Sequence, residues 1–416
     1  ELQNLQDFKV FAPATREQAA NAGKHVIGTR WVLRKKGDGV KARVVAQEMN
    51  RGVPRDNFAA APSSLATRLV LWWAARHPGW VCGTLDVSAA FLHAPLDEEM
   101  YVEIPSGGSV AEAGCLGEIA LALKALYGFQ VSPRVFQEFV EEVLKKHKVR
   151  RLHSEAQLFI HDPTGSLIVI HADDVLFATP KGSAEFMYQM FEAEMKLKRG
   201  PIISEDAWTP YLGRLYRRTA RGYEVKIPDR FYQSVFDLYG LKAGTHNRKQ
   251  AVCTPFATKA EQEAGGDPLP PEALRLYRAV AGKLMWASGE RPEILFPVKE
   301  LCRHFTDATD ASQASAKRLV RYLLGTCDAT LHLEINEAFD GQEDLEHCEV
   351  QAVSDATWAS TSDYRSTSGG SIWIEGFLIH AWSKTQPTVS QSSCESELLA
   401  ANLAAKEGLF VKTILE

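Results

Sequence analysis

The sequence predicts an α+β protein built from more than one domain. Its 416 residues exceed the length of one ordinary domain, and its 45% hydrophobic content with mixed charge is typical of a globular protein. Short strands alternate with helices in the first third, three helical segments follow one another later, and a new strand begins at Glu349. We therefore expect domains at residues 1–200, 201–345 and 346–416.

The elements of the first domain follow from turn and capping signals. Val26–Lys35 and Val40–Ala46 are typical of two strands joined by the turn Gly37-Asp38-Gly39. Leu167–Ala172 and Val175–Ala178 predict a second pair of strands. Helices are expected at Thr67–Arg76, Val135–Lys146 and Ser183–Lys196.

The rest of the chain predicts a helical region and then a small α/β module. A hairpin is expected at Tyr211–Tyr216 and Gly222–Ile227, and loops at Glu261–Pro271 and Asn336–Glu346. Helices follow at Asp229–Tyr239, Leu274–Ser288, Pro297–Phe305 and Ala311–Leu324. The last module combines the strand Glu349–Asp355, the hairpin Ser371–Ile374 and Phe377–Trp382, and a helix beginning at Ser392 or Ser393.

Composition narrows the classes of function. No apolar run is long enough to span a membrane, and seven scattered cysteines without a paired spacing argue against a zinc site and for an intracellular setting. The net charge of −5 does not indicate a nucleic-acid binder, yet basic residues cluster locally, for example between Lys145 and Arg151. Because the chain begins at Glu1, not at methionine, we expect a piece of a longer polypeptide.

Acidic residues interrupt two apolar strands. Asp173 and Asp174 follow the run Leu167–Ala172, and Asp86 lies within Val81-Cys-Gly-Thr-Leu-Asp-Val. Taken alone, Asp173-Asp174 would fit a turn or a helix cap. Because a carboxylate in a strand is costly to bury unpaired, two such strands together indicate a shared cation, typically a metal pair that serves phosphoryl transfer.

Further segments in order carry a more specific pattern, and it covers nearly the whole chain. They are Arg30-Trp-Val, Lys41-Ala-Arg-Val-Val-Ala, Phe58-Ala-Ala-Ala-Pro, Leu85-Asp-Val-Ser-Ala-Ala-Phe-Leu, Leu126-Tyr-Gly-Phe-Gln-Val-Ser-Pro-Arg, Ala172-Asp-Asp-Val, Tyr211-Leu-Gly, Arg321-Tyr-Leu-Leu-Gly-Thr, Ser354-Asp-Ala-Thr-Trp-Ala and Ser392-Ser-Cys-Glu-Ser-Glu. The ordered set resembles the reverse transcriptase and ribonuclease H region of copia-type LTR retrotransposon Pol polyproteins.

The resemblance implies a right-hand polymerase, with fingers and palm in residues 1–200 and the palm end, thumb and connection in 201–345. Residues 346–416 would form an incomplete ribonuclease H-like module. The implied function is RNA-directed DNA polymerisation by two metals, Mg²⁺ or Mn²⁺, held by Asp86, Asp173 and Asp174. The implied partners are primer–template RNA or DNA and deoxynucleoside triphosphates, and the implied locations are cytoplasmic virus-like particles and the nucleus.

Four residues are candidates for nucleotide binding. Lys41 and Arg43 occupy the family's fingers hairpin, where basic side chains reach the triphosphate, although either could be an ordinary exposed strand residue. Phe91 would lie under the sugar and exclude a 2′-hydroxyl, or else be a core residue. Gln130 would support the nucleotide, but the family carries glutamine one position later, where Val131 stands.

The C-terminal module is expected to hold a second metal site with Asp355 and Glu397 as ligands. Glu395 competes with Glu397, but Ser392-x-x-Glu395 fits a capping box, whereas Glu397 precedes a small apolar face of alanines at helical spacing. The family's remaining acids are expected after Glu416, so we expect little ribonuclease H activity from residues 1–416 alone.

Two alternatives remain open from the sequence. The chain could be a decayed or repurposed retroelement protein that binds nucleic acid without turnover, because His171 replaces the aromatic residue that usually stands two before the acidic pair. An unrelated two-metal nucleotidyltransferase would explain Asp86 and Asp173-Asp174, but it would leave Asp355 and Glu397 unexplained.

Overall fold

The computed structural model describes residues 1–37, 39–49, 56–105, 118–241, 250–256, 266–339, 348–360 and 363–416. Asp38 of the predicted first turn and parts of both predicted loops lie outside the described residues. The chain divides into two compact units, unit 1 with residues 1–63 and 83–200 and unit 2 with residues 64–82 and 201–416.

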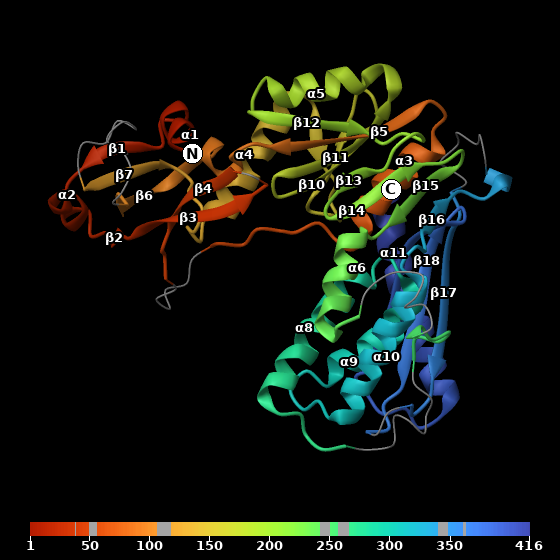
Figure 1. The fold of residues 1–416 in the computed structure, drawn as a ribbon. Helices are drawn as coiled ribbons and strands as arrows, with labels where there is room; N and C mark the ends of the chain where they lie inside the picture. Colours follow the sequence, from red (N-terminus) through yellow and green to blue (C-terminus); the bar gives the residue numbers. More distant parts are fainter. Residues whose placement is uncertain are drawn as a thin grey trace. The chain divides into compact units, whose positions relative to one another are not determined.

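Unit 1 combines helices with two sheets and a separate hairpin (Figure 1). Its helices are α1 (Leu2–Asp7), α2 (Arg16–Asn21), α4 (Ser132–Lys146) and α5 (Ala184–Glu192). The first sheet has the order β1-β7-β6-β2 and contains β1 (Phe11–Ala14), β7 (Ile119–Lys124), β6 (Pro95–Glu103) and β2 (Val26–Ile27). The hairpin pairs β3 (Thr29–Lys36) with β4 (Gly39–Ala46).

The second sheet has six strands in the order β12-β5-β11-β10-β9-β8. They are β12 (Leu197–Ile202), β5 (Trp80–Val87), β11 (Asp174–Pro180), β10 (Ser166–His171), β9 (Leu158–His161) and β8 (Val149–Arg151). Every residue of β10 before His171 is buried, which explains its unbroken run of leucine, isoleucine and valine.

Strands β10 and β11 form the predicted strand–turn–strand. Ile170 pairs with Val175 and His171 with Asp174, so Ala172 and Asp173 make a two-residue turn. Ala172 has φ 54°, in the left-handed region that residues other than glycine seldom adopt. The acidic pair therefore sits at a tight, strained turn at the end of a buried hairpin.

Unit 2 begins with a helix from the early chain, α3 (Ser64–Arg76), and continues after residue 200. Its first sheet has the order β13-β14-β15-β16, with β13 (Thr209–Tyr211), β14 (Arg214–Arg218), β15 (Gly222–Lys226) and β16 (Leu331–Glu334). Four helices share one apolar core that includes Tyr232, Tyr277 and Leu319. They are α6 (Asp229–Phe236), α8 (Pro271–Ala287), α9 (Leu295–Arg303) and α10 (Asp310–Thr326).

The C-terminal elements belong to unit 2 as well. Strands β17 (Val350–Thr357), β18 (Thr367–Ile374) and β19 (Phe377–Thr385) form an antiparallel sheet, and α11 (Ser393–Leu415) packs along β17 and β18 (Figure 1). The hairpin predicted over Glu375-Gly376 is present, and Ser392 caps α11 as expected.

Two predicted elements differ from the structure. The strand expected at Tyr211–Tyr216 is divided into β13 and β14 by a turn at Leu212 and Gly213, both of which have positive φ. The helix expected at Ser183–Lys196 begins after a 3-10 turn, Lys181–Ser183, and ends at Glu192, because the chain turns into β12 at Leu197.

The described ranges contain no helix with the length and apolar character needed to cross a membrane.

Candidate functional site

The three predicted aspartates come together within unit 1. Strands β5 and β11 are neighbours in the sheet, and the Val87 N–H donates a 2.7 Å hydrogen bond to the peptide oxygen of Asp173. This bond brings Asp86, which directly precedes Val87, beside the turn that carries Asp173 and Asp174. All three side chains are half-buried.

The electrostatics of Asp174 reflect this crowding. The pKa of Asp174 is raised to about 6, mainly by burial and then by the neighbouring charges of Asp173 and Asp86, while His171 opposes the rise. Like charges at short range disfavour ionisation, so the cluster carries negative charge that no described cation neutralises fully. A divalent cation would relieve this repulsion.

This repulsion predicts how Asp174→Asn affects stability. The folded-state pKa of Asp174, about 6, lies above its ordinary value of 3.8. Between these two pH values the native state binds more protons than the unfolded state does, so the free energy of unfolding falls as the pH rises. In metal-free buffer, Asp174→Asn should therefore raise the unfolding temperature at pH 7.5 and change it less at pH 5. Scanning calorimetry at both values measures this, with the exposed Asp206→Asn as control. An equal effect of Asp174→Asn at both values would contradict it.

The donor set of the cluster fits Mg²⁺ better than a softer metal. Carboxylate oxygens are hard ligands, and Mg²⁺ retains several waters while using one or two protein carboxylates together with substrate phosphates. Within the described residues, no three acidic, histidine or cysteine side chains form a ready-made metal cage. Asp86, Asp173 and Asp174, although neighbours, are therefore not such a group by themselves.

Aromatic and basic groups line the approach to the carboxylates. The guanidinium of Arg43, on β4, lies over the ring of Tyr127 at 4.8 Å from its centroid, and the Phe91 ring meets Tyr127 edge-on at 5.1 Å between centroids. Burial raises the pKa of the Tyr127 hydroxyl, with a further contribution from the charge of Asp173, whereas Arg43 lowers it and hydrogen-bonds to it. Tyr127 therefore contacts both Arg43 and Phe91 and lies within electrostatic range of Asp173.

A glycine makes this arrangement possible. Gly128 has φ 94°, and a Cβ at this position would lie 2.0 Å from the peptide oxygen of Ala46. The close approach allows the Ala46 N–H to donate a 2.7 Å hydrogen bond to the peptide oxygen of Tyr127. This bond connects β4 to the segment before α4. A side chain at residue 128 would push Tyr127 away from Arg43.

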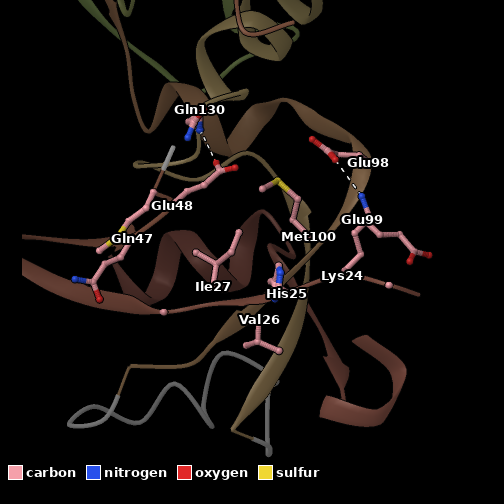
Figure 2. A pocket seen from close by; sticks show the side chains of 13 residues that line it. Lys24, His25, Val26, Ile27, Gln47, Glu48, Glu98, Glu99, Met100 and Gln130 are labelled. Carbon is pink, nitrogen blue, oxygen red and sulfur yellow. Dashed lines mark hydrogen bonds and ion pairs between the residues drawn. The ribbon is translucent and has the colours of Figure 1, made fainter. Parts of the chain in front are cut away.

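The other two nucleotide-binding candidates are placed differently. Lys41 is exposed on β4, two residues before Arg43 and on the same face of the hairpin. Gln130 accepts a hydrogen bond from Asn57 and its backbone N–H donates one to Glu48. Gln130 also lines a cavity of about 470 Å³ whose charged residues are mostly glutamates, as Figure 2 shows.

The C-terminal candidates lie on neighbouring elements. Asp355 is exposed on β17, and Glu397 is exposed in the first turns of α11. Of the alanines expected to form an apolar face after Glu397, Ala400 and Ala404 are buried and Ala401 is exposed. The buried i, i+4 row begins at Ser396, so Glu397 lies beside this row and not on it.

A side-chain bridge places both acids at one end of the sheet. Gln386 donates to the peptide oxygen of Ser396, just before Glu397, and to the hydroxyl of Ser368. Ser368 on β18 pairs with Ala356 on β17, the residue after Asp355. The start of α11 and the end of β17 are therefore held together.

Glu395 has a structural role. Its backbone N–H donates to the Ser392 hydroxyl at 3.1 Å, and its carboxylate accepts from the Gln391 N–H at 2.7 Å. The first bond caps the helix, whereas the second reaches Gln391 and not the Ser392 N–H, so the expected capping box is only half formed.

Tyr127 was not among the sequence-based candidates. It lies within the quoted segment Leu126–Arg134, but nothing in the local pattern indicates that Arg43, more than eighty positions earlier, would lie over its ring. Its only sequence signal is the adjacent Gly128.

Comparison with known proteins identifies the family. Residues 18–252, more than half of the chain, match the family described as reverse transcriptase (RNA-dependent DNA polymerase). This match includes the three aspartates, Arg43, Phe91 and Tyr127.

Relatives extend the match along the chain. It is 26% identical over 402 residues to the retrovirus-related Pol polyprotein from transposon RE2 of Arabidopsis thaliana, covering 94% of this chain and 26% of that protein. It is 25% identical over 429 residues to the corresponding polyprotein from transposon TNT 1-94 of Nicotiana tabacum, covering 95% of this chain and 30% of that protein. The chain thus spans between a quarter and a third of these relatives. The predicted resemblance to copia-type Pol polyproteins is confirmed, and the chain belongs to the reverse transcriptase (RNA-dependent DNA polymerase) family.

Proposed function

We propose that this protein is the RNA-directed DNA polymerase of a retrotransposon and that it extends a primer by two-metal nucleotidyl transfer. The observation that carries the proposal is the meeting of Asp86 with the Asp173-Asp174 turn beside Arg43 and Tyr127. Within the right-hand layout, residues 1–200 would supply fingers and palm, and residues 201–345 the palm end, thumb and connection. The substrates would be primer–template and deoxynucleoside triphosphates.

The roles of the residues follow from their chemistry. Asp86 and Asp173 would be the direct ligands of Mg²⁺ or Mn²⁺, with Asp174 beside them. Two such ions, when bound, stabilise the attacking and the leaving oxygens of an in-line displacement. Arg43, oriented by Tyr127, and Lys41 would hold the triphosphate, since guanidinium groups contact phosphate in a bidentate manner and lysine acts as a point charge.

Gln130 has the weakest support among the four nucleotide-binding candidates. A polyphosphate would be repelled by Glu48, Glu98 and Glu99 in the cavity that Gln130 lines. Lys24, the one lysine among the described lining residues, is paired with Glu98 at 3.2 Å (Figure 2). Gln130 therefore stays a prediction that rests on the resemblance.

Primer extension on an RNA template with Mg²⁺ tests the proposal. Templated incorporation of deoxynucleotides supports it. Tight binding of primer–template without any incorporation would favour the alternative, a repurposed retroelement protein that binds nucleic acid without turnover. The exposed His171, register partner of Asp174, motivates that alternative.

Phe91→Ala should relax the selection against ribonucleotides. Phe91 is half-buried against Tyr127 and Phe136, so its truncation opens space beside the carboxylates for a 2′-hydroxyl. The ratio of ribonucleotide to deoxynucleotide incorporation should rise. Phe136→Leu, at the buried neighbour, should leave the ratio unchanged. If Phe91 only fills the core, Phe91→Ala would instead cost roughly 3–5 kcal/mol of stability with selectivity unaltered.

We also propose that residues 346–416 belong to a ribonuclease H-like module with Asp355 and Glu397 as metal ligands. Their position at one end of the sheet supports this. Cleavage of an RNA–DNA hybrid by the natural protein should be lost in Glu397→Gln and retained in Glu395→Gln. Loss of hybrid cleavage in Glu395→Gln but not in Glu397→Gln would show that Glu395 is the metal ligand.

A further inference from the structure

A second pocket in unit 1 has a charge opposite to that of the glutamate-lined cavity. It measures about 400 Å³ and lies among the end of α4, strand β9 and the start of α5. Its lining contains three kinds of group, which are basic side chains, hydroxyls and one aromatic ring, and no carboxylate. The lining residues are Lys146, His147, Lys148, His161, Pro163, Thr164, Ser183 and Phe186.

The basic side chains of the pocket are only partly neutralised. Lys146 pairs with Glu194 at 2.9 Å, and His147 lies 3.9 Å from the same carboxylate. Lys148 is exposed, with φ 59°, and its ammonium forms no ion pair with any described residue. An anion entering the pocket would therefore meet an uncompensated positive charge.

Hydrogen bonds fix the histidine wall of the pocket. His161 is 4% exposed, and its Nδ1 lies 2.6 Å from the Thr164 hydroxyl, which in turn lies 2.6 Å from the Ser166 hydroxyl. The Ser166 hydroxyl continues to Thr179 at 2.7 Å. The His161 ring is therefore held in place from its Nδ1 side.

An aromatic ring and a free hydroxyl complete the pocket. Phe186, on α5, is 42% exposed, and its ring centroid lies 5.3 Å from that of His161. Ser183 precedes α5 at the cap position, but its side chain makes no capping hydrogen bond. An exposed phenyl ring beside an unpaired cation, here Lys148, is a combination that proteins use to stack a base and hold its phosphate.

The pocket is separate from the carboxylates. Ser166, bonded to Thr164, begins β10, and His171, next to the acidic turn, ends it. The five residue steps from Ser166 to His171 span roughly 16–17 Å of strand. A ligand in the pocket therefore does not occupy the polymerase centre.

We propose that this pocket binds one nucleotide unit of a single-stranded nucleic acid, with the phosphate at Lys148 and Ser183 and the base against Phe186. It would anchor a strand outside the primer–template site. Stacking is tolerant of sequence, so the contact would serve any base.

Photo-crosslinking tests the position of the strand. A 20-nucleotide oligouridine RNA carrying 4-thiouridine should cross-link to the peptide that contains Phe186, even with a blunt primer–template hybrid in excess. Absence of this cross-link, with cross-links confined to the segments around Asp86 and Asp173, would overturn the proposal.

Binding of the same RNA tests the contacts. By fluorescence anisotropy, Phe186→Ala should weaken binding at least fivefold, and Phe186→Tyr should restore it. Lys148→Ala should lower the slope of log K against log salt by about 0.7, whereas Lys145→Ala, whose side chain pairs with Glu141 outside the pocket, should change it less. Binding by both pocket variants within twofold of the native protein would overturn the proposal.

Two further measurements separate this proposal from others. Single-nucleotide incorporation on saturating primer–template should be unchanged in Phe186→Ala, and the RNA cross-link should persist in Asp173→Asn, which removes incorporation. If uridine 5′-monophosphate bound as tightly as the 20-mer, the ligand would be a free nucleotide and the assignment to a strand would be overturned.

Discussion

Asp173→Asn should abolish primer extension and leave the fold intact. The change removes a negative charge from the place where the metals and the reacting phosphate would meet. Loss of one preorganised electrostatic group typically costs about 10²–10³-fold in rate, and a direct metal ligand should cost at least as much. Extension on an RNA template with Mg²⁺, followed by single-turnover kinetics, measures the loss.

The geometry of the turn explains why folding should survive this substitution. The Val87 N–H donates to the peptide oxygen of Asp173 and not to its side chain, so asparagine keeps that bond. Asparagine is also favoured at turn positions. Asp162→Asn, at an exposed aspartate of the same unit paired with Arg150, provides the matched control and should retain activity. Full activity of Asp173→Asn would refute the proposed site.

Arg76→Met should destabilise unit 2 by about 3–5 kcal/mol, since it leaves the partner carboxylate buried and unpaired. Arg76, at the end of α3, lies 2.5 Å from Glu375 in the β18–β19 turn, and both side chains are almost completely buried, with 1% and 0% exposed. Burial raises the pKa of Glu375, and Arg76 opposes the rise, so the pair is held together by mutual neutralisation. Denaturant unfolding of the whole chain measures the loss.

A double substitution separates the ion pair from simple packing. Replacing a buried pair by uncharged groups is often neutral, so Arg76→Met with Glu375→Gln should recover most of the lost stability. If the double variant were as unstable as the sum of the two single ones, the two side chains would not be coupled.

Local signals in the sequence were sufficient for the acidic hairpin and for the capped helix α11. The run of branched apolar residues before Asp173 predicts a buried strand. The two aspartates that follow predict that this strand ends in a turn. Ser392 and Glu395 likewise satisfy the helix start through residues three positions apart.

Features that depend on distant partners could not be predicted in this way. The approach of Arg43 to Tyr127 depends on the close contact between Gly128 and the peptide oxygen of Ala46. The hydrophobic periodicity of the sequence does not reveal this contact. The exposure of Glu397 depends on which row of α11 meets the sheet. In the same way, nothing in the residues of α3 shows that Arg76 would bond to a turn near residue 375.

The placement of α3 has a consequence for biosynthesis. This helix leaves the ribosome before residue 83, but the rest of its unit begins only at residue 201, after the 118 residues of 83–200 have been made. Until then its large apolar side chains, such as Leu69 and Trp72, which are buried in the finished unit, have no partners to cover them. The nascent chain is therefore exposed to aggregation or chaperone capture during this interval, and a fragment made of residues 201–416 would lack the helix that contacts β15 and β19.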